Sequence, residues 1–264
     1  MEENIIENKD GISIQIKDLN VPKENPGKNQ AQIAGAIIIA GLIIAGAILL
    51  KGGSTSTIVD SKGQQLVANA KVFNQCLDSG KYAKAVADSK IEASTAGVQG
   101  TPKGFILVNS GIVNTIDGAE PTEIVKQKID KALAGSEKTI PNIKLAPVSN
   151  SDFIMGNKDS SVATGVTIIE YADFQCPFCG KFFKETEETL IKDYLQAGKI
   201  RFVYRDFAFL GAESVQAAQA ARCAGEQGKF WEYHDYLFNH QNGENQGNFS
   251  DLYLKSFAGE LKLK

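Results

Sequence analysis

The sequence has few of the residues that build metal centres and disulfide scaffolds: among its 264 residues are four cysteines and two histidines. Four cysteines are too few to hold a small disulfide-rich fold together, although they can form two pairs in an oxidising compartment. The chain also lacks a basic excess, because its net charge is −3, and we therefore exclude nucleic acid as a partner. With 43% hydrophobic and 22% charged residues, the composition is that of a globular chain.

One long segment has no charge at all. The eighteen residues from Ile33 to Leu50 are uncharged, and as a helix they would span roughly 27 Å, close to the hydrocarbon thickness of a bilayer. A polar leader of thirty residues precedes the segment and no small-residue cleavage site follows it closely. We therefore predict an uncleaved transmembrane anchor over 31–50 rather than a signal peptide or a buried core helix. Near the segment, Lys17, Lys23 and Lys28 precede it and Lys51 and Lys62 follow it, a small excess that favours a cytoplasmic N-terminus.

The rest of the sequence divides by composition. The leader is rich in turn formers and has no sustained apolar period, and the residues after the anchor are rich in Gly and Ser. Two periodic stretches follow, separated by a stretch of turn residues. We predict a disordered cytoplasmic tail over 1–30, the anchor over 31–50, a tether over 51–70, an ordered block over 71–135, a linker over 136–163 and a second ordered block over 164–264.

The two ordered blocks have different patterns. The first predicts two helices, a hairpin with its turn at Asn109 to Gly111, and a helix that Pro121 opens and Gly135 ends. The second begins with a buried strand in "GVTIIEYADF", continues with a helix that has one apolar stripe, and returns as a strand in "GKIRFVYRDF". The segments after that strand are helical by spacing. The chain is therefore predicted to have an α/β fold.

Two cysteines lie where the first strand of the second block gives way to its helix. In "CPFC" they are Cys176 and Cys179. Unpaired N–H groups and the helix dipole favour an anion at the first, which lowers its thiol pKa, and the second can close a disulfide with it one turn on. Zinc would need a further ligand pair, and we assign His234 and His240 to a helix surface or cap instead, so no metal is predicted. Redox chemistry is favoured over an inert structural disulfide.

The residues around this pair resemble a known family. Both "VTIIEYADFQCPFCGKFF" and "AARCAGEQGKFWEYHDYLF" are similar to the DsbA-like branch of the thioredoxin superfamily, which are membrane-anchored bacterial thiol-disulfide oxidoreductases. Upstream, "FNQCLDSGKYAKAV", "GVQGTPKGFILVN" and "DGAEPTEIVKQKIDKAL" resemble the end of the same domain. In the family this second group follows the first, whereas here it precedes it.

The resemblance implies a thioredoxin fold with a helical insertion and with its halves in permuted order, a circular permutation. The alternative is that each half is completed by the other half of a neighbouring chain. A flexible linker of twenty-eight residues averages roughly 30 Å end to end, about twice the radius of gyration of such a domain. It can therefore bridge the two halves, and we predict closure within one chain.

The resemblance also implies roles for individual residues. Cys176 matches the exposed nucleophile, Cys179 the resolving thiol, and Glu170 an acid that relays protons to Cys179. Thr101 and Pro102 match the cis-proline loop that packs against the cysteine pair and binds an extended substrate peptide. Two residues depart from the most oxidising members: Phe178 stands where they have histidine, and Lys103 places a charge beside the predicted groove, where it either stabilises the Cys176 thiolate or faces water.

The other two cysteines, Cys76 and Cys223, lie in separate helical stretches, one in each block. Each is compatible with a buried small apolar residue. We predict instead that they form a structural disulfide.

Taken with the anchor, these residues predict a single-pass protein of the bacterial cytoplasmic membrane, with its catalytic domain on the extracytoplasmic side. It would exchange disulfides with cysteine-containing exported proteins, oxidising them, without a cofactor and with a membrane quinone-linked protein as reoxidant. The alternatives are a disulfide reductase or isomerase and a non-catalytic binding protein that keeps the fold.

Overall fold

The computed structural model describes residues 5–7, 13–15, 70–156 and 165–264. The chain forms two compact units, Met1–Leu66 and Val67–Lys264. In the first, strands β1 (Ile5–Glu7) and β2 (Ser13–Gln15) pair antiparallel. The sequence predicted a disordered tail over 1–30, and these strands depart from that prediction. The anchor predicted over 31–50 lies outside the described residues. Among the helices in the described ranges, none has the length and apolar character needed to cross a membrane.

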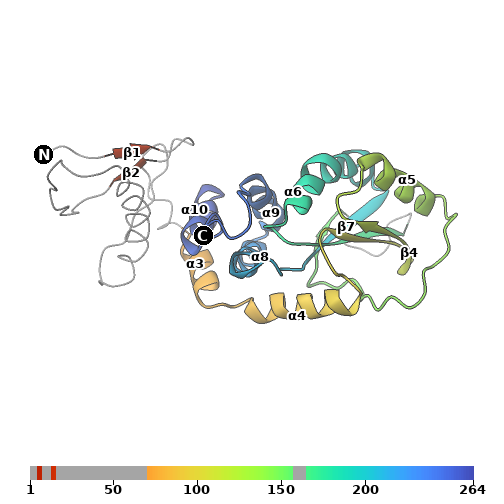
Figure 1. Ribbon diagram of the computed structural model, residues 1–264, viewed down its shortest axis with the longest axis horizontal. Helices are drawn as coiled ribbons and strands as arrows, with labels where there is room; N and C mark the ends of the chain where they lie inside the picture. The colour runs from red at the N-terminus through yellow and green to blue at the C-terminus, as the bar shows by residue number, and fades with distance from the viewer. Residues whose placement is uncertain (1–4, 8–12, 16–69, 157–164) are drawn as a thin grey trace, which may run out of the picture. The chain divides into compact units, whose positions relative to one another are not determined.

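The second unit is built on a five-stranded sheet with strand order β4-β3-β6-β7-β5. Strands β6 and β7 are parallel, and β3 pairs antiparallel with both β6 and β4. The strands are β3 (Lys103–Val108), β4 (Gly111–Asp117), β5 (Phe153–Met155), β6 (Val166–Ala172) and β7 (Ile200–Asp206). Figure 1 shows α5 (Thr122–Leu133) and α6 (Pro177–Phe182) on one side of this sheet and α4 (Ala83–Thr95) on the other.

Strand β6 is the centre of the sheet, and all seven of its residues are buried. Its near-continuous apolar sequence fits a strand that is covered on both faces. Residues of β6 pack alternately into a cluster beneath α5 and α6, with Ile168, and into a cluster on the side of α4, with Ile169. This alternation follows from the two-residue repeat of a strand, and it decides which way Glu170 points.

The turn between β3 and β4 has the chemistry that the sequence predicted. Asn109 and Ser110 both have positive φ, 49° and 71°, which is the left-handed conformation of a two-residue hairpin turn. Pro121 precedes α5, where a missing N–H costs nothing, and Gly135 follows it with φ 65°.

The helix after β6 is continuous but not regular. After α6 the chain runs through two π-helical turns, η1 (Phe183–Glu187) and η2 (Ile191–Leu195), which flank the short α7 (Glu188–Leu190). A π turn widens the helix by one residue and therefore rotates the following side chains relative to an α-helix. The sequence predicted a single α-helical stripe, and the π turns are a departure from it.

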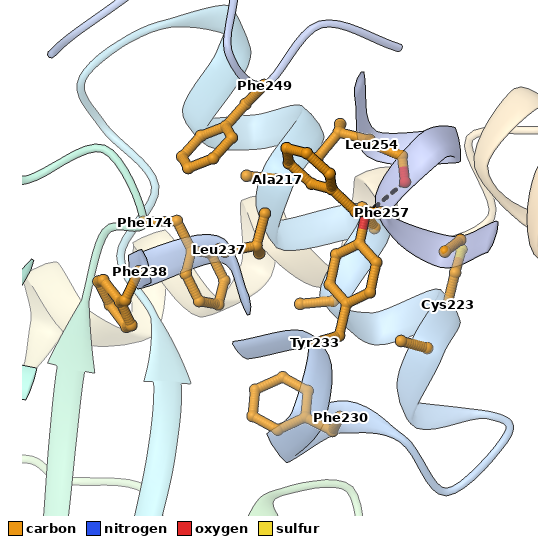
Figure 2. Close-up of a cluster of buried hydrophobic side chains, with 14 of the residues drawn as sticks. Phe174, Ala217, Cys223, Phe230, Tyr233, Leu237, Phe238, Phe249, Leu254 and Phe257 are labelled. Atoms are coloured by element: carbon orange, nitrogen blue, oxygen red, sulfur yellow. Dashed lines mark hydrogen bonds between the residues drawn. The ribbon is translucent and has the colours of Figure 1, made fainter. Parts of the chain in front are cut away.

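The remaining helices gather at one end of the sheet (Figure 1). They are α3 (Lys71–Asp78), α8 (Ala212–Gly225), α9 (Phe230–Asn239) and α10 (Asp251–Glu260). Their apolar faces meet in one cluster, which includes Phe230, Leu237 and Phe249 (Figure 2). Inside the cluster the Tyr233 hydroxyl donates to the Leu254 carbonyl at 2.8 Å, so that this buried polar group has a partner.

The two ordered blocks meet within one chain. Strand β3 of the earlier block pairs along its whole length with β6 of the later one, from Lys103 opposite Tyr171 to Val108 opposite Val166. At the far end of the unit, the Phe73 N–H donates to the Lys264 carbonyl at 2.7 Å, so the start of α3 lies against the C-terminal residue. Cys76 of α3 and Cys223 of α8 form a disulfide between the blocks.

The stretch predicted as a linker over 136–163 contains structure. Its strand β5 pairs antiparallel with β7 at the sheet edge, with Phe153 opposite Tyr204. Three residues are too few to show a two-residue repeat, and all three are half-buried, so the sequence has no pattern there that marks a strand.

Candidate active site

The paired cysteines lie at the start of α6, directly after the centre of the sheet. Cys176 occupies the N-cap position, with extended backbone, and Pro177 is the first helical residue. The Gly180 N–H donates to the Cys176 carbonyl at 3.0 Å, which closes the first turn and brings Cys179 beneath Cys176. Both cysteines are free thiols in this structure.

The loop before β3 packs against these sulfurs. The peptide bond between Thr101 and Pro102 is cis, and the Cys176 Sγ donates to the Thr101 carbonyl oxygen at 3.3 Å. Pro102 is buried, and its carbonyl accepts from the Gly118 N–H at 2.9 Å, which fixes the loop to the end of β4. The structure therefore brings together the two segments that lie some seventy residues apart in the sequence, because β3 and β6 are neighbours in the sheet.

The two thiols have opposite electrostatic environments. Hydrogen bonding from Cys179, aided by Thr101 and by the N–H groups of Cys179 and Phe178, lowers the pKa of Cys176 to about 6, although burial acts the other way. Burial, followed by hydrogen bonding to Cys176 and its charge, raises the pKa of Cys179 well above its ordinary value. One sulfur is therefore a thiolate at neutral pH and the other a thiol, which is the asymmetry that a nucleophile and a resolving cysteine require.

The surface around Cys176 is apolar. Cys176 retains 5% of its accessible surface, which is less than the exposed position expected for it, because the Thr101–Pro102 loop covers it. The adjacent Phe178 is 61% exposed. A large aromatic side chain that is open to solvent beside a reactive sulfur is available for contact with a partner protein.

Glu170 lies on β6 beneath the cysteine pair. It is 3% exposed, and burial, followed by the charge of Cys176, raises its pKa to about 8. It is therefore protonated at neutral pH. When Glu170 is ionised, its charge contributes to the raised pKa of Cys179, so Glu170 and both thiols interact electrostatically.

Two polar side chains hold the turn between β6 and α6. The Asp173 carboxylate accepts from the Gln175 N–H at 2.9 Å and from the N–H groups of Phe209 and Leu210 at 2.9 and 3.1 Å. The Gln241 amide donates to the carbonyls of Phe174 and Cys176 at 2.6 and 3.1 Å. The backbone that leads into the cysteine pair is thus fixed to the segments that follow β7 and α9.

Lys103 does not turn toward the cysteine pair. Its ammonium pairs with Asp117 of the neighbouring strand β4 and lies 5.5 Å from the centre of the Phe105 ring. Lys103 therefore makes its contacts within the β3–β4 hairpin and does not stabilise the Cys176 thiolate.

Residues 149–262 match the family model described as Thioredoxin. This segment contains β6, the cysteine pair and β7, but not the Thr101–Pro102 loop that packs against the cysteines. Over this segment the chain is similar to the thioredoxin family.

Curated proteins and solved structures are also similar to parts of this chain. The chain is 35% identical over 114 residues to the Na(+)/H(+) antiporter NhaA 3 of Salinispora tropica. The matched residues make up 42% of this chain and 16% of the relative. It is 30% identical over 95 residues to a protein named as a protein-disulfide oxidoreductase of Rickettsia typhi, covering 36% of this chain and 33% of the relative. A crystal structure of alpha-DsbA1 of Wolbachia pipientis is similar at 24% identity and a TM-score of 0.39, over 46% of this chain and 58% of that one.

The thioredoxin-family match and the oxidoreductase relative confirm the resemblance to DsbA-like thiol-disulfide oxidoreductases that the motifs indicated. The chain spans only about a sixth to a third of the lengths of these two curated relatives. The family model begins at residue 149, so the β3–β4 hairpin, α5 and the cis-proline loop lie outside the matched segment.

Sequence reasoning missed a buried acid–base group beside the site. His234 of α9 was assigned to a helix surface or cap, but it is fully buried, with its ring against Phe174, Tyr204 and Phe238. His240 is exposed, and its Nδ1 lies 2.7 Å from the Tyr236 carbonyl near the end of α9. The aromatic residues spaced along "FWEYHDYLF" were the signal that the face carrying His234 is buried.

Glu187 completes this group. It is 1% exposed, and one oxygen or nitrogen atom from each of Glu187, His234 and Asp235 lies within 4.8 Å of the others. Burial raises the pKa of Glu187 well above its ordinary value, and the Nδ1 of His234 is already engaged by Asp235 at 2.9 Å. Metal ligands must be deprotonated, so a protonated Glu187 does not suit a metal. We interpret the three as an acid–base group.

Proposed function

We propose that this chain catalyses thiol–disulfide exchange through Cys176 and Cys179. The observation that carries the proposal is the environment of the Cys176 sulfur. It lies 3.3 Å from the Thr101 carbonyl of the cis-proline loop, and its pKa is lowered to about 6 by the hydrogen bond from a second, high-pKa thiol. A thiolate with a resolving partner and a peptide-like loop beside it is the arrangement that forms and resolves mixed disulfides.

The residues then have the following roles in oxidation of a substrate. A substrate thiolate attacks Cys176 in the disulfide form; a bond forms between those sulfurs, and the Cys176–Cys179 bond breaks. Cys179 leaves as a thiolate and takes a proton from Glu170, whose raised pKa keeps it protonated at pH 7. A second substrate thiolate then attacks the substrate sulfur of the mixed disulfide and releases Cys176 as a thiolate. The substrate loses two electrons and the cysteine pair gains them.

Oxidation is the favoured direction. A low pKa for Cys176 stabilises the reduced pair, and a pair whose reduced form is stable oxidises its partners. Phe178 supplies no cation to the thiolate, so hydrogen bonds alone provide this stabilisation, and we expect a milder oxidant than relatives with histidine at this position. A reductase or isomerase is the alternative for the same residues.

The substrates and location follow from two further observations. The Cys76–Cys223 disulfide supports an oxidising compartment, because structural disulfides persist outside the cytosol. The uncharged segment at 31–50 supports a single-pass anchor in a bacterial cytoplasmic membrane. We therefore place the catalytic unit on the extracytoplasmic side, acting on cysteine-containing exported proteins, with a membrane quinone-linked protein as reoxidant.

The order of the elements supports a circular permutation. The hairpin and cis-proline loop precede the matched thioredoxin segment in the chain yet lie beside its central strand. The start of α3 and the C-terminal residue are in contact, with the Phe73 N–H on the Lys264 carbonyl, so the two ends meet where a connection would run in the family order. Pairing of β3 with β6 inside one chain supports closure without a neighbouring copy.

The activity is tested by the reoxidation of a reduced, unfolded test protein with several disulfides. We expect the oxidised chain to accelerate disulfide formation and the Cys176→Ala variant to be inactive. If the two behave alike, the chain is a binding protein and the proposal fails. Equilibration of the cysteine pair with a glutathione buffer then gives its reduction potential, and a potential below that of the compartment would indicate a reductase instead.

A further inference from the structure

Glu187 is a buried acid that the mechanism above does not use. It is the last residue of the π turn η1 and is buried, whereas Glu185 and Glu188 on either side of it are exposed. Its Oε1 has no hydrogen-bond partner within the described part of the chain. A buried carboxyl oxygen without a partner is costly, so its presence calls for a functional explanation.

Glu187 faces the same interior as Glu170. Glu170 is opposite Tyr204 in the parallel register of β6 and β7, so the two side chains share one face of the sheet. The Tyr204 ring lies edge-on to the His234 ring, with ring centres 5.0 Å apart. The Phe183 ring, one turn before Glu187, is also edge-on to the His234 ring, with ring centres 5.7 Å apart. Strand β6, the π turn and α9 thus meet around one point beneath the cysteine pair.

His234 and Asp235 connect this buried interior to the surface. The Nδ1 of His234 lies 2.9 Å from an oxygen of Asp235, and the Asp235 side chain is 52% exposed. Glu187 lies within 4.8 Å of both, a separation that one bridging water spans. The other ring nitrogen of His234 has no partner among the described residues.

We propose that Glu187, together with His234 and Asp235, carries protons between solvent and Glu170. The inference rests on the proposed function, because it supplies what that mechanism lacks: a route by which a buried Glu170 recovers its proton. When Cys179 takes the proton of Glu170, the carboxylate left behind is 3% exposed and faces the Cys176 thiolate. Glu187 returns a proton to Glu170, and the His234–Asp235 pair returns one from solvent to Glu187. No electron moves in these steps.

Titratable and charged groups of several elements lie around this interior. They are Glu170 from β6, Tyr204 from β7, the two thiols from the start of α6, and His234 and Asp235 from α9. From α5, the Thr122 hydroxyl bonds to Thr186 at 3.0 Å, and Lys126 pairs with Asp193 at 3.0 Å. In support, burial, then the charges of Glu170 and Asp235, raises the pKa of Glu187, so it holds a proton to donate.

Glu187 is in this sense a positioning residue for protons, not a group that touches substrate. Its removal should slow the proton-dependent step and leave the nucleophile intact. The full chain would be compared with Glu187→Gln, which keeps shape and burial but cannot carry a proton, and with Glu188→Gln as the control, since Glu188 is the exposed neighbour. Asp235→Asn tests the surface end of the route with little risk to folding.

Two readouts separate this role from a structural one. The first is the pH profile of the rate at which the oxidised chain oxidises a dithiol peptide, with its solvent deuterium isotope effect. We expect Glu187→Gln to be about tenfold slower at pH 7 with a larger isotope effect, Asp235→Asn about threefold slower, and Glu188→Gln unchanged. The second is alkylation of Cys176 in the reduced chain, whose midpoint near pH 6 should remain within about half a unit in all three variants.

The outcomes are distinct. A folded Glu187→Gln variant with the wild-type pH profile and isotope effect overturns the proton route and leaves the proposed function standing. A slow variant whose Cys176 midpoint has moved by a unit or more also overturns it, because the effect then lies in the nucleophile. If the wild type is no faster than Cys176→Ser, both proposals fall.

Discussion

At Cys176 a single sulfur receives contributions from segments far apart in the sequence. The N-cap position of α6 supplies N–H groups, Cys179 supplies a hydrogen bond one turn on, and Thr101 approaches from the loop before β3. The N–H groups and Cys179 belong to the same helix as Cys176, whereas Thr101 reaches the sulfur only because β3 pairs with β6. The reactivity of the residue is therefore a property of the fold as much as of the motif.

The thiolate of Cys176 should be measurable directly. The rate of alkylation by iodoacetamide should rise with pH about a midpoint near 6, because only the thiolate reacts and the pKa of Cys176 is lowered to about 6. Cys179 should stay unmodified over the same range, since its pKa is well above the ordinary value. Mass mapping of the alkylated peptide assigns the site, with Cys176→Ser as the blank. A midpoint near 9 would contradict the hydrogen-bonded environment described above.

Glu170 makes stability depend on pH in a defined direction. Its folded-state pKa of about 8 lies above the ordinary 4.5, so the folded state prefers the proton. The stabilisation is complete below about pH 4.5 and is lost as pH rises through 8. The comparison is made in a Cys176→Ser background, which removes the competing thiolate. Between pH 5 and 8 the free energy of unfolding should fall less in the Glu170→Gln variant than in its parent, and the two falls should differ by about 1 to 2 kcal/mol or more. Urea unfolding across this range measures it, and equal slopes would refute it.

At the level of elements, the strand and helix patterns of the sequence predicted most of what positions the site. The apolar run at Val166 to Ala172, the turn at Asn109 and Ser110, and Pro121 before α5 each have a local cause, and each appears in the structure as expected. Local chemistry and tertiary packing favour the same conformation at these positions, which is why a single sequence is enough to find them.

Other elements depend on partners that local sequence does not contain. Strand β5 exists because β7 has a free edge beside it, and no pattern within three residues signals that. Glu187 lies eight residues after Cys179, so an α-helical repeat places it on the buried stripe, but the sequence does not show that this carboxyl is enclosed without a hydrogen-bond partner for Oε1. The aromatic spacing of α9 signals a buried face for His234, but the rings of Phe174, from the turn after β6, and of Tyr204 on β7 that enclose it are tertiary neighbours.

Gly104 tests how tightly the hairpin is packed against the site. A methyl group on its Cα would lie 2.9 Å from the Cβ of Ile116 on the adjacent strand, which backbone pairing holds in place. Gly104→Ala should therefore reduce the free energy of unfolding by about 1 to 3 kcal/mol, as overpacking of a core does. Gly100→Ala is the matched control, because nothing lies within 4 Å of the position its methyl group would take. Urea titration compares the two, and equal stability of both variants would contradict the packing argument.

At the scale of the whole unit, the disulfide and the sheet join the two blocks by different means. Cys76 and Cys223 are 147 residues apart, and on the chain-entropy model a bridge over so long a loop is worth about 5 kcal/mol, before any strain is subtracted. The β3–β6 ladder joins the same blocks at the opposite end of the unit, through backbone pairing of six residues on each strand. We therefore expect the two blocks to stay together even when the chain between them is cut.

If the element order is a permutation, the connection through residues 157–164 should be dispensable once the two ends are joined. A variant that begins at Gly165, continues from Lys264 through a few Gly and Ser residues into Ala70, and ends at Gly156 keeps every described residue of the second unit. Because the Phe73 N–H already contacts the Lys264 carbonyl, this joint spans a short gap. We expect a monomer by light scattering, the same circular dichroism, and an exchange rate within about threefold of the parent unit, 70–264. A well-folded variant that lacks activity would show that the order of the segments itself shapes the site, and a dimer would show that the blocks close between chains.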